Sequence, residues 1–150
     1  MTRIDFYLSA GENESTFLAF VCKLVAKAYR LDHHIFIFTE DEKIMQQLDS
    51  QLWTFQPHSF IPHSCHEYHE HTPVLIADKL PDNYDYDLCV NLSENIFADF
   101  SRFKRVVEVI DQQPQRIESG RKRFKMYRHK HYPIHQHDLR KKTQHATSPA

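Results

Sequence analysis

Short apolar runs alternate with helix-period segments in the first half of the chain, and this alternation limits the folds open to it. Residues 3–8 alternate apolar and polar side chains and residues 34–39 form an apolar run, so both segments predict strands. Apolar residues from Leu18 to Ala28 recur at helical spacing, and Asp41 can cap a second helix. Short crossovers of this kind join parallel strands, which predicts an α/β fold.

The second half of the chain continues the alternation and completes one domain. Further strands are predicted at residues 73–77, 87–91 and 106–110, a short helix at 95–103, and a last helix from Pro114 to about His129. A length of 150 residues favours one domain with its own core. We therefore predict a single α/β domain over residues 1–132 and a flexible, polar tail over 133–150.

The turn after the first predicted strand lacks the glycines of a phosphate-binding loop. Such loops use glycine so that backbone N–H groups can approach the anion. The whole chain has 2 glycines, Gly11 and Gly120, and the first turn carries Glu12 and Glu14, which would repel a pyrophosphate. We therefore expect a Rossmann-like three-layer fold with a mostly parallel central sheet, no nucleotide-binding loop and no cofactor.

Histidines crowd around a cysteine in the longest predicted connection, residues 55–72. Cys65, His66, His69 and His71 are weak candidates for metal ligands, because their spacing fits no well-defined structural zinc pattern. We favour an adventitious metal or none over a zinc site, and the alternative is a polar loop whose histidines titrate near neutral pH. A hydrolase or metal enzyme built on this loop would need a bound metal and a substrate pocket.

The chain carries no feature of a membrane or secreted protein. No apolar run approaches the ~20 residues that span a bilayer. The N-terminus reaches Asp5 without the apolar stretch of a signal peptide, and the 3 cysteines show no pairing pattern. A cytoplasmic protein that does not contact membranes is expected.

Positive charge is concentrated at the C-terminal end. Residues 1–113 hold 9 Lys and Arg against 18 Asp and Glu, whereas residues 114–150 hold 10 against 2. On the last predicted helix, Arg121, Phe124, Lys125 and Arg128 lie on one stripe at helical spacing. Cations around an aromatic ring suit a partner that is acidic and apolar, or a nucleic acid. The ordinary alternative is a solvated basic helix whose Phe124 packs into the core.

Several segments, in this order, resemble one family. They are Phe6-Tyr7-Leu8, Leu52-Trp53, Pro57-His58-Ser59-Phe60-Ile61-Pro62-His63, Asn91-Leu92-Ser93 and Arg121-x-Arg123-Phe124-Lys125-x-Tyr127-Arg128. Over about residues 3–132 the chain resembles the chi subunit of the bacterial DNA polymerase III holoenzyme, a clamp-loader accessory protein. The block from Leu52 to His63 is the most specific part of this likeness.

The resemblance implies a non-catalytic replication adaptor with a Rossmann-like fold and no bound nucleotide. It joins the clamp loader through the psi subunit and binds the acidic C-terminal tail of single-stranded DNA-binding protein, so that DNA is contacted mainly indirectly. Some members also bind a helicase-like protein through the psi surface. Any polymerase activity would belong to the holoenzyme, since no paired metal-binding carboxylates are visible in the sequence.

The resemblance also implies which residues contact each partner. The tail-binding positions map onto Arg121, Phe124, Lys125 and Ile110, and Arg128 shares their stripe. Family members commonly have Tyr at the position of Phe124, and a further basic position is expected near Arg116 or Ile117.

Psi binding maps onto Trp53, Phe60 and Pro62. The alternative for Trp53 and Phe60 is packing inside this chain. For the basic helix, direct nucleic-acid binding stays open as a second function.

Overall fold

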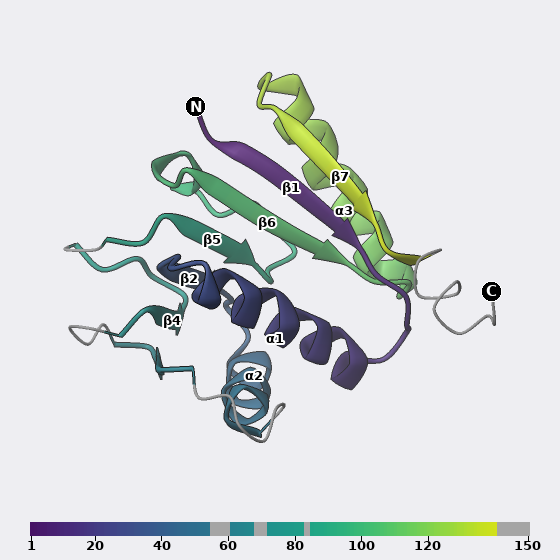
Figure 1. Ribbon diagram of the computed structural model, residues 1–150. Coiled ribbons are helices and arrows are strands. Elements are labelled where there is room, and N and C mark those ends of the chain that lie inside the picture. The colour runs from purple at the N-terminus through teal and green to yellow at the C-terminus, as the bar shows by residue number, and fades with distance from the viewer. Residues whose placement is uncertain (55–60, 68–71, 83–84, 141–150) are drawn as a thin grey trace.

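The computed structural model is a seven-stranded sheet with helices on both faces (Figure 1). It describes residues 1–54, 61–67, 72–82 and 85–140. The strands are β1 (Arg3–Leu8), β2 (Ile35–Phe38), β3 (His63–Cys65), β4 (Val74–Ala77), β5 (Leu88–Asn91), β6 (Arg105–Ile110) and β7 (Ile134–Asp138). Their order is β3-β4-β2-β5-β6-β1-β7, and each neighbouring pair is parallel. The predicted α/β fold with a parallel central sheet is confirmed.

The helices form the two outer layers. Helices α1 (Glu14–Arg30) and α2 (Glu42–Thr54) pack together over one face of the sheet, and α3 (Pro114–His129) covers the other with the short 3₁₀ turn η1 (Phe100–Arg102) (Figure 1). Helix α2 begins where expected, because Asp41 Oδ1 accepts a hydrogen bond of 2.9 Å from the backbone N–H of Lys43.

The core is divided by the sheet into two apolar clusters, which explains the continuous apolar runs. Along β2, Ile35 and Ile37 point toward α1 and α2, whereas Phe36 and Phe38 point toward α3 and η1. Successive side chains of a strand face opposite sides. A strand covered on both faces must therefore be apolar at every position, as parallel strands commonly are.

Both edges of the sheet lie outside the predicted strands. Strand β7 pairs with β1, so the domain extends beyond the boundary predicted at residue 132, and the segment 134–138 belongs to the sheet rather than to a tail. The sequence of β7 is polar because an edge strand buries little side-chain surface. Of the β7 residues, Ile134 alone packs against the core beneath α3. Strand β3 at the other edge is short and half-buried, and the helix predicted at 95–103 is reduced to η1.

A buried ion pair fixes α3 against the sheet. Glu108 on β6 is fully buried, and its carboxylate accepts hydrogen bonds from Arg123 Nε (2.9 Å), Tyr127 Oη (2.7 Å) and Asn91 Nδ2 (2.9 Å). Arg123 is itself buried and also donates to the carbonyl of Glu94 at 2.9 Å. Two of these donors lie on α3, so the network sets the rotation of that helix about its axis.

A second buried carboxylate joins three strands near the β7 edge. Asp5 on β1 has no exposed side-chain surface and accepts hydrogen bonds from Arg3, from Arg105 on β6 at 2.7 Å and from His137 on β7 at 2.8 Å. Burial alone would raise the pKa of Asp5, but the hydrogen bonds from His137, Arg3 and Arg105 outweigh it and lower that pKa below its usual value.

Replacing Arg123 by Met should strongly destabilise the protein. The change leaves the Glu108 carboxylate buried without its cation, and breaking a buried pair in this way costs about 3–5 kcal/mol. Urea unfolding measures the loss, with Arg121→Met on the exposed side of the same helix as the matched control, expected to change the unfolding free energy by less than ~0.5 kcal/mol. Equal effects of the two substitutions would contradict the role given to the network.

The contribution of Asp5 should depend on pH in a defined direction. A carboxyl whose pKa is lowered on folding adds stability above its unfolded value of about 3.9, and that stability is lost as the pH falls through the lower folded value. We expect the stability difference between the wild type and Asp5→Asn to be full at pH 6 and to shrink as the pH falls below about 4. Unfolding free energies of both proteins across this range measure it, and a pH-independent difference would be inconsistent with a lowered pKa.

Candidate functional site

The outer surface of α3 carries a row of cations, Arg121, Lys125 and Arg128, which we name the cationic stripe. All three side chains are exposed, and within the described residues none of them has an acidic partner. Their neighbour Lys122 lies off the stripe and pairs with Glu118 at 3.9 Å. Unpaired cations on a rigid helix can accept an external anion without first breaking an internal ion pair.

Phe124 lies at the boundary between the stripe and the core. Its half-buried ring packs edge-on against Phe6 of β1, with 5.3 Å between ring centroids, and joins the cluster beneath α3. The structure therefore gives Phe124 both an inner contact with the core and an outer surface beside the cations. Because the ring is anchored from below, it would meet a ligand with little further loss of side-chain freedom.

Ile110 lies beneath α3 rather than on the stripe. Its side chain is buried at the end of β6, and a Cβ added at Gly120 would lie 2.5 Å from Ile110 Cδ1. Gly120 thus permits close approach of α3 to the sheet at this point. Ile110 supports the helix from below, and the exposed surface above it belongs to α3.

The turn before the stripe supplies no further free cation. Arg116 pairs with Glu14 at 2.9 Å and with the buried Asp111 at 3.0 Å, and its guanidinium lies 3.5 Å from the centroid of the Phe17 ring. Ile117 packs against the core cluster beneath α3. The additional basic position expected near Arg116 or Ile117 is therefore occupied by an arginine that is already engaged or by an apolar residue.

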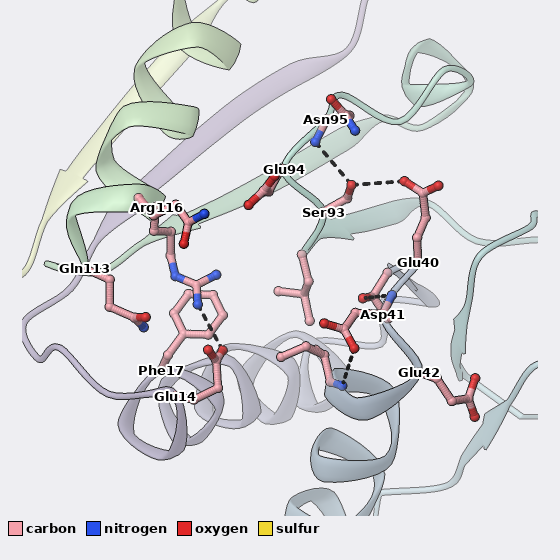
Figure 2. Close-up of a pocket in the computed structure, with 14 residues that line it drawn as sticks. Glu14, Phe17, Glu40, Asp41, Glu42, Ser93, Glu94, Asn95, Gln113 and Arg116 are labelled. Atoms are coloured by element: carbon pink, nitrogen blue, oxygen red, sulfur yellow. Dashed lines mark hydrogen bonds and ion pairs between the residues drawn. The ribbon is translucent and has the colours of Figure 1, made fainter.

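An open pocket of about 750 Å³ lies at the carboxyl ends of the strands, between α1, α2 and the start of α3 (Figure 2). In open α/β sheets this edge is where nucleotides usually bind. Here its lining includes the acidic residues Glu14, Glu40, Asp41, Glu42 and Glu94. Among the described residues that line it, the one arginine is the engaged Arg116, so the charge of this pocket would repel a phosphate group.

Trp53 forms an exposed apolar surface at the end of α2, on the opposite side of the sheet from α3. The residue is 50% exposed, and its ring centroid lies 4.6 Å from that of His63 on β3. Pro62 is half-buried directly before that strand. Phe60, the third residue assigned to psi binding, lies outside the described residues.

The histidine-rich segment shows no metal site in its described part. His66 is exposed and pairs with Glu42 at 3.0 Å, while Cys65 is half-buried. Burial, with the nearby Asp49, raises the pKa of the Cys65 thiol to about 12, which disfavours the thiolate that metals bind. His69 and His71 lie outside the described residues, and among the rest no group of three or more His, Cys, Asp or Glu side chains could hold a metal ion.

Sequence reasoning missed two residues that support these surfaces. Arg123 is absent from the predicted stripe, and no local signal showed that it pairs with a buried carboxylate, although its position two residues from Arg121 places it on another side of the helix. Asp49, which contacts His63 at 2.9 Å, gave no local signal because the two residues are far apart in the chain. No helix in the part of the chain that the structure describes is both long and apolar enough to span a membrane.

Comparisons with known proteins agree on one family. The family model described as "DNA polymerase III chi subunit, HolC" matches residues 1–135. DNA polymerase III subunit chi of Pseudomonas aeruginosa is 33% identical over 139 residues, which cover 93% of this chain and 98% of that protein. The subunits of Escherichia coli K12 (31% over 112 residues, 72% and 76% covered) and Haemophilus influenzae (28% over 128 residues, 83% and 88% covered) are also similar. This chain therefore belongs to the family of DNA polymerase III chi subunits, which are accessory subunits in DNA replication.

Proposed function

We propose that this chi-family chain is an adaptor without catalytic activity of its own. Its α3 surface binds the acidic C-terminal tail of single-stranded DNA-binding protein, and its Trp53 surface binds the psi subunit of the clamp loader. The observation that carries the tail-binding part is the cationic stripe, whose three cations have no acidic partner among the described residues and lie around the anchored ring of Phe124.

The chemistry of such a tail matches this surface. A peptide with several carboxylates, an apolar end residue and a free terminal carboxylate needs cations for attraction and an apolar surface for its last side chain. Arg121 and Arg128 can each present a planar guanidinium to a carboxylate through two parallel hydrogen bonds. Phe124 provides the apolar contact, and since it has no hydroxyl group, it binds through ring packing alone.

The psi-binding part of the proposal depends on the exposed indole of Trp53. Large aromatic side chains contribute much of the buried area at protein interfaces. Pro62, directly before β3, would extend the same surface, and Phe60 is the third residue assigned to it. The helicase-like partner of some family members would use this surface as an alternative to psi.

Direct binding of single-stranded DNA to α3 is the second candidate, favoured by the same unpaired cations. The acidic pocket beside the first turn of α3 opposes a long phosphate-binding track, since carboxylates line it and Glu14 is in direct contact with Arg116 of that turn. Filter binding with bare single-stranded DNA, with and without single-stranded DNA-binding protein, separates the two functions. Retention of DNA by the chain alone would favour the second.

Replacing Arg121 by Ala should weaken binding of an acidic tail peptide by about 1–3 kcal/mol, because a charge-assisted contact is lost. Titration calorimetry at low salt measures the affinity. Lys122→Ala is the matched control, since it removes the same charge from the neighbouring position off the stripe, and it should have a much smaller effect. Equal losses for both variants would indicate general electrostatic attraction rather than a site.

Replacing Trp53 by Ala should abolish capture of psi while the circular dichroism spectrum of the folded chain is retained, because half of the residue is exposed. The control is Met126→Ala on α3, which removes a large apolar residue of nearly equal exposure, 49%, on the opposite side of the sheet. Undiminished psi capture by the Trp53 variant would contradict the assignment. Loss of the folded spectrum would instead place the indole in the core.

A further inference from the structure

A second pocket, of about 520 Å³, lies between α1 and the strands next to the β7 edge, and we name it the α1 groove. The second half of α1 forms one wall, and residues of β5, β6 and β1 form the floor. The far side consists of His137 on β7 and Leu139 directly after that strand. Its volume is typical of binding sites, and none of the described residues that line it is acidic. The groove thus differs in charge from the acidic pocket of Figure 2.

The groove lies where the sheet is covered on one face only. Phe6 of β1 packs in the cluster beneath α3, whereas its neighbour Tyr7 points to the side of α1. In Figure 1, α3 lies behind β1 and β7, and in the described part of the chain no helix lies in front of these two strands. Tyr7 is half-buried and stacks on His137, with 4.4 Å between the ring centroids. Parallel strands are commonly covered by helices on both faces, so a further helix at this position would complete the layer.

Helix α1 presents an apolar stripe to the groove in addition to its core-facing side. Leu24, Lys27 and Ala28 on α1 and its C-cap residue Leu31 line the groove at the spacing i, i+3, i+4 and i+7. Leu31 is 63% exposed, and Leu24 is half-buried. Side chains at this spacing form the ridges by which one helix packs against another. The shape of this wall therefore fits a second helix better than an extended peptide.

Two permanent cations give the groove a positive charge. Lys27 is exposed, and it has no acidic partner among the described residues. Arg105 on β6 is held in place because its Nε donates to Asp5 at 2.7 Å and its Nη2 donates to Tyr7 Oη at 2.8 Å. The Arg105 side chain is 30% exposed, whereas the Asp5 side chain has no exposed surface. A ligand in the groove would therefore meet cations beside apolar side chains.

The charge of the groove also argues against the segment of this chain that follows β7. Residues 141–150 include Lys141 and Lys142, contain no acidic residue and have no apolar side chain larger than that of proline. They carry the same sign of charge as the groove and cannot fill its apolar surface. Charge complementarity instead requires an occupant that carries carboxylates.

We infer that the α1 groove binds an amphipathic helix of a partner protein, whose apolar stripe is bordered by acidic side chains. Such a helix would lay its apolar side chains between Leu24 and Leu31 of α1 and the rings of Tyr7 and His137. Its carboxylates would pair with Lys27 and Arg105. This surface is separate from the cationic stripe and from Trp53, and the inference depends on neither of the functions proposed for them.

A synthetic peptide tests the groove directly. The probe has about 16 residues, an amidated end, leucines at helical spacing and glutamates on both sides of the leucine stripe. A control peptide has the same composition, scrambled so that its leucines share no face. Backbone amide shifts of the labelled chain should change most along the second half of α1 and along β7 with the first peptide, and not with the second. The amidated end removes the free carboxylate that α3 is proposed to bind.

Charge reversal in the last turn of α1 provides matched variants. Lys27→Glu should weaken binding of the probe peptide by about tenfold or more, because a cation of the groove becomes an anion. Arg30→Glu makes the same change in the same turn at an exposed residue that does not line the groove, and it should weaken binding by less than about threefold. Leu31→Glu changes an exposed residue, so the fold should be retained, and we expect a loss of about tenfold. Psi capture should be unaltered in all three variants.

A photo-reactive residue in place of Leu31 tests the inference in cells, where mass spectrometry identifies the cross-linked segment. We expect an acidic amphipathic segment of another protein, and absence of any cross-link would count against the inference. Cross-linking to a second copy of this chain, with a dimer in sedimentation that Leu31→Glu dissociates, would overturn the partner helix in favour of self-association. Equal binding of the two peptides, equal losses in Lys27→Glu and Arg30→Glu, or amide shifts confined to α3 would each overturn the groove as a specific site.

Discussion

The buried carboxylate of Glu108 is the contact on which the rest of the structure depends. It accepts hydrogen bonds from Arg123 and Tyr127 on α3, and this fixes which side of the helix faces the sheet. With Arg123 and Tyr127 turned inward, the cationic stripe must face outward. A carboxylate in the core is costly unless it is fully paired, so this network favours one rotation of α3 over any other. The proposed binding surface is thus determined from inside the protein.

The two proposed surfaces lie on opposite sides of the sheet, an arrangement suited to an adaptor. Helix α3 covers one face, whereas Trp53 ends a helix that covers the other (Figure 1). Two partners could therefore be bound at once without contact between them. Between the surfaces lies the pocket where related folds bind nucleotides, and its carboxylates give it the wrong charge for that ligand (Figure 2).

The sequence predicted the layers well and the sheet edges poorly, for a physical reason. Inner strands such as β2 are apolar at each position because both of their faces are covered, which leaves a clear pattern. Edge strands bury little side-chain surface, so the sequence of β7 is polar and lacks the apolar pattern that predicts a strand. Helical spacing predicts the cationic stripe. It does not predict that Arg123 faces the core, because that orientation depends on Glu108 in a distant strand. The contact of Asp49 with His63 was hidden for the same reason.

The most direct test of the central claim is a map of the binding site by NMR. Backbone amide shifts of the labelled chain would be followed while an unlabelled acidic peptide with an apolar final residue and a free carboxylate is added. The account predicts that the largest changes lie along α3, at Arg121, Phe124, Lys125 and Arg128, while the amides of α1 and α2 stay unchanged. Changes concentrated on another face, or spread evenly over all exposed lysines and arginines, would contradict it.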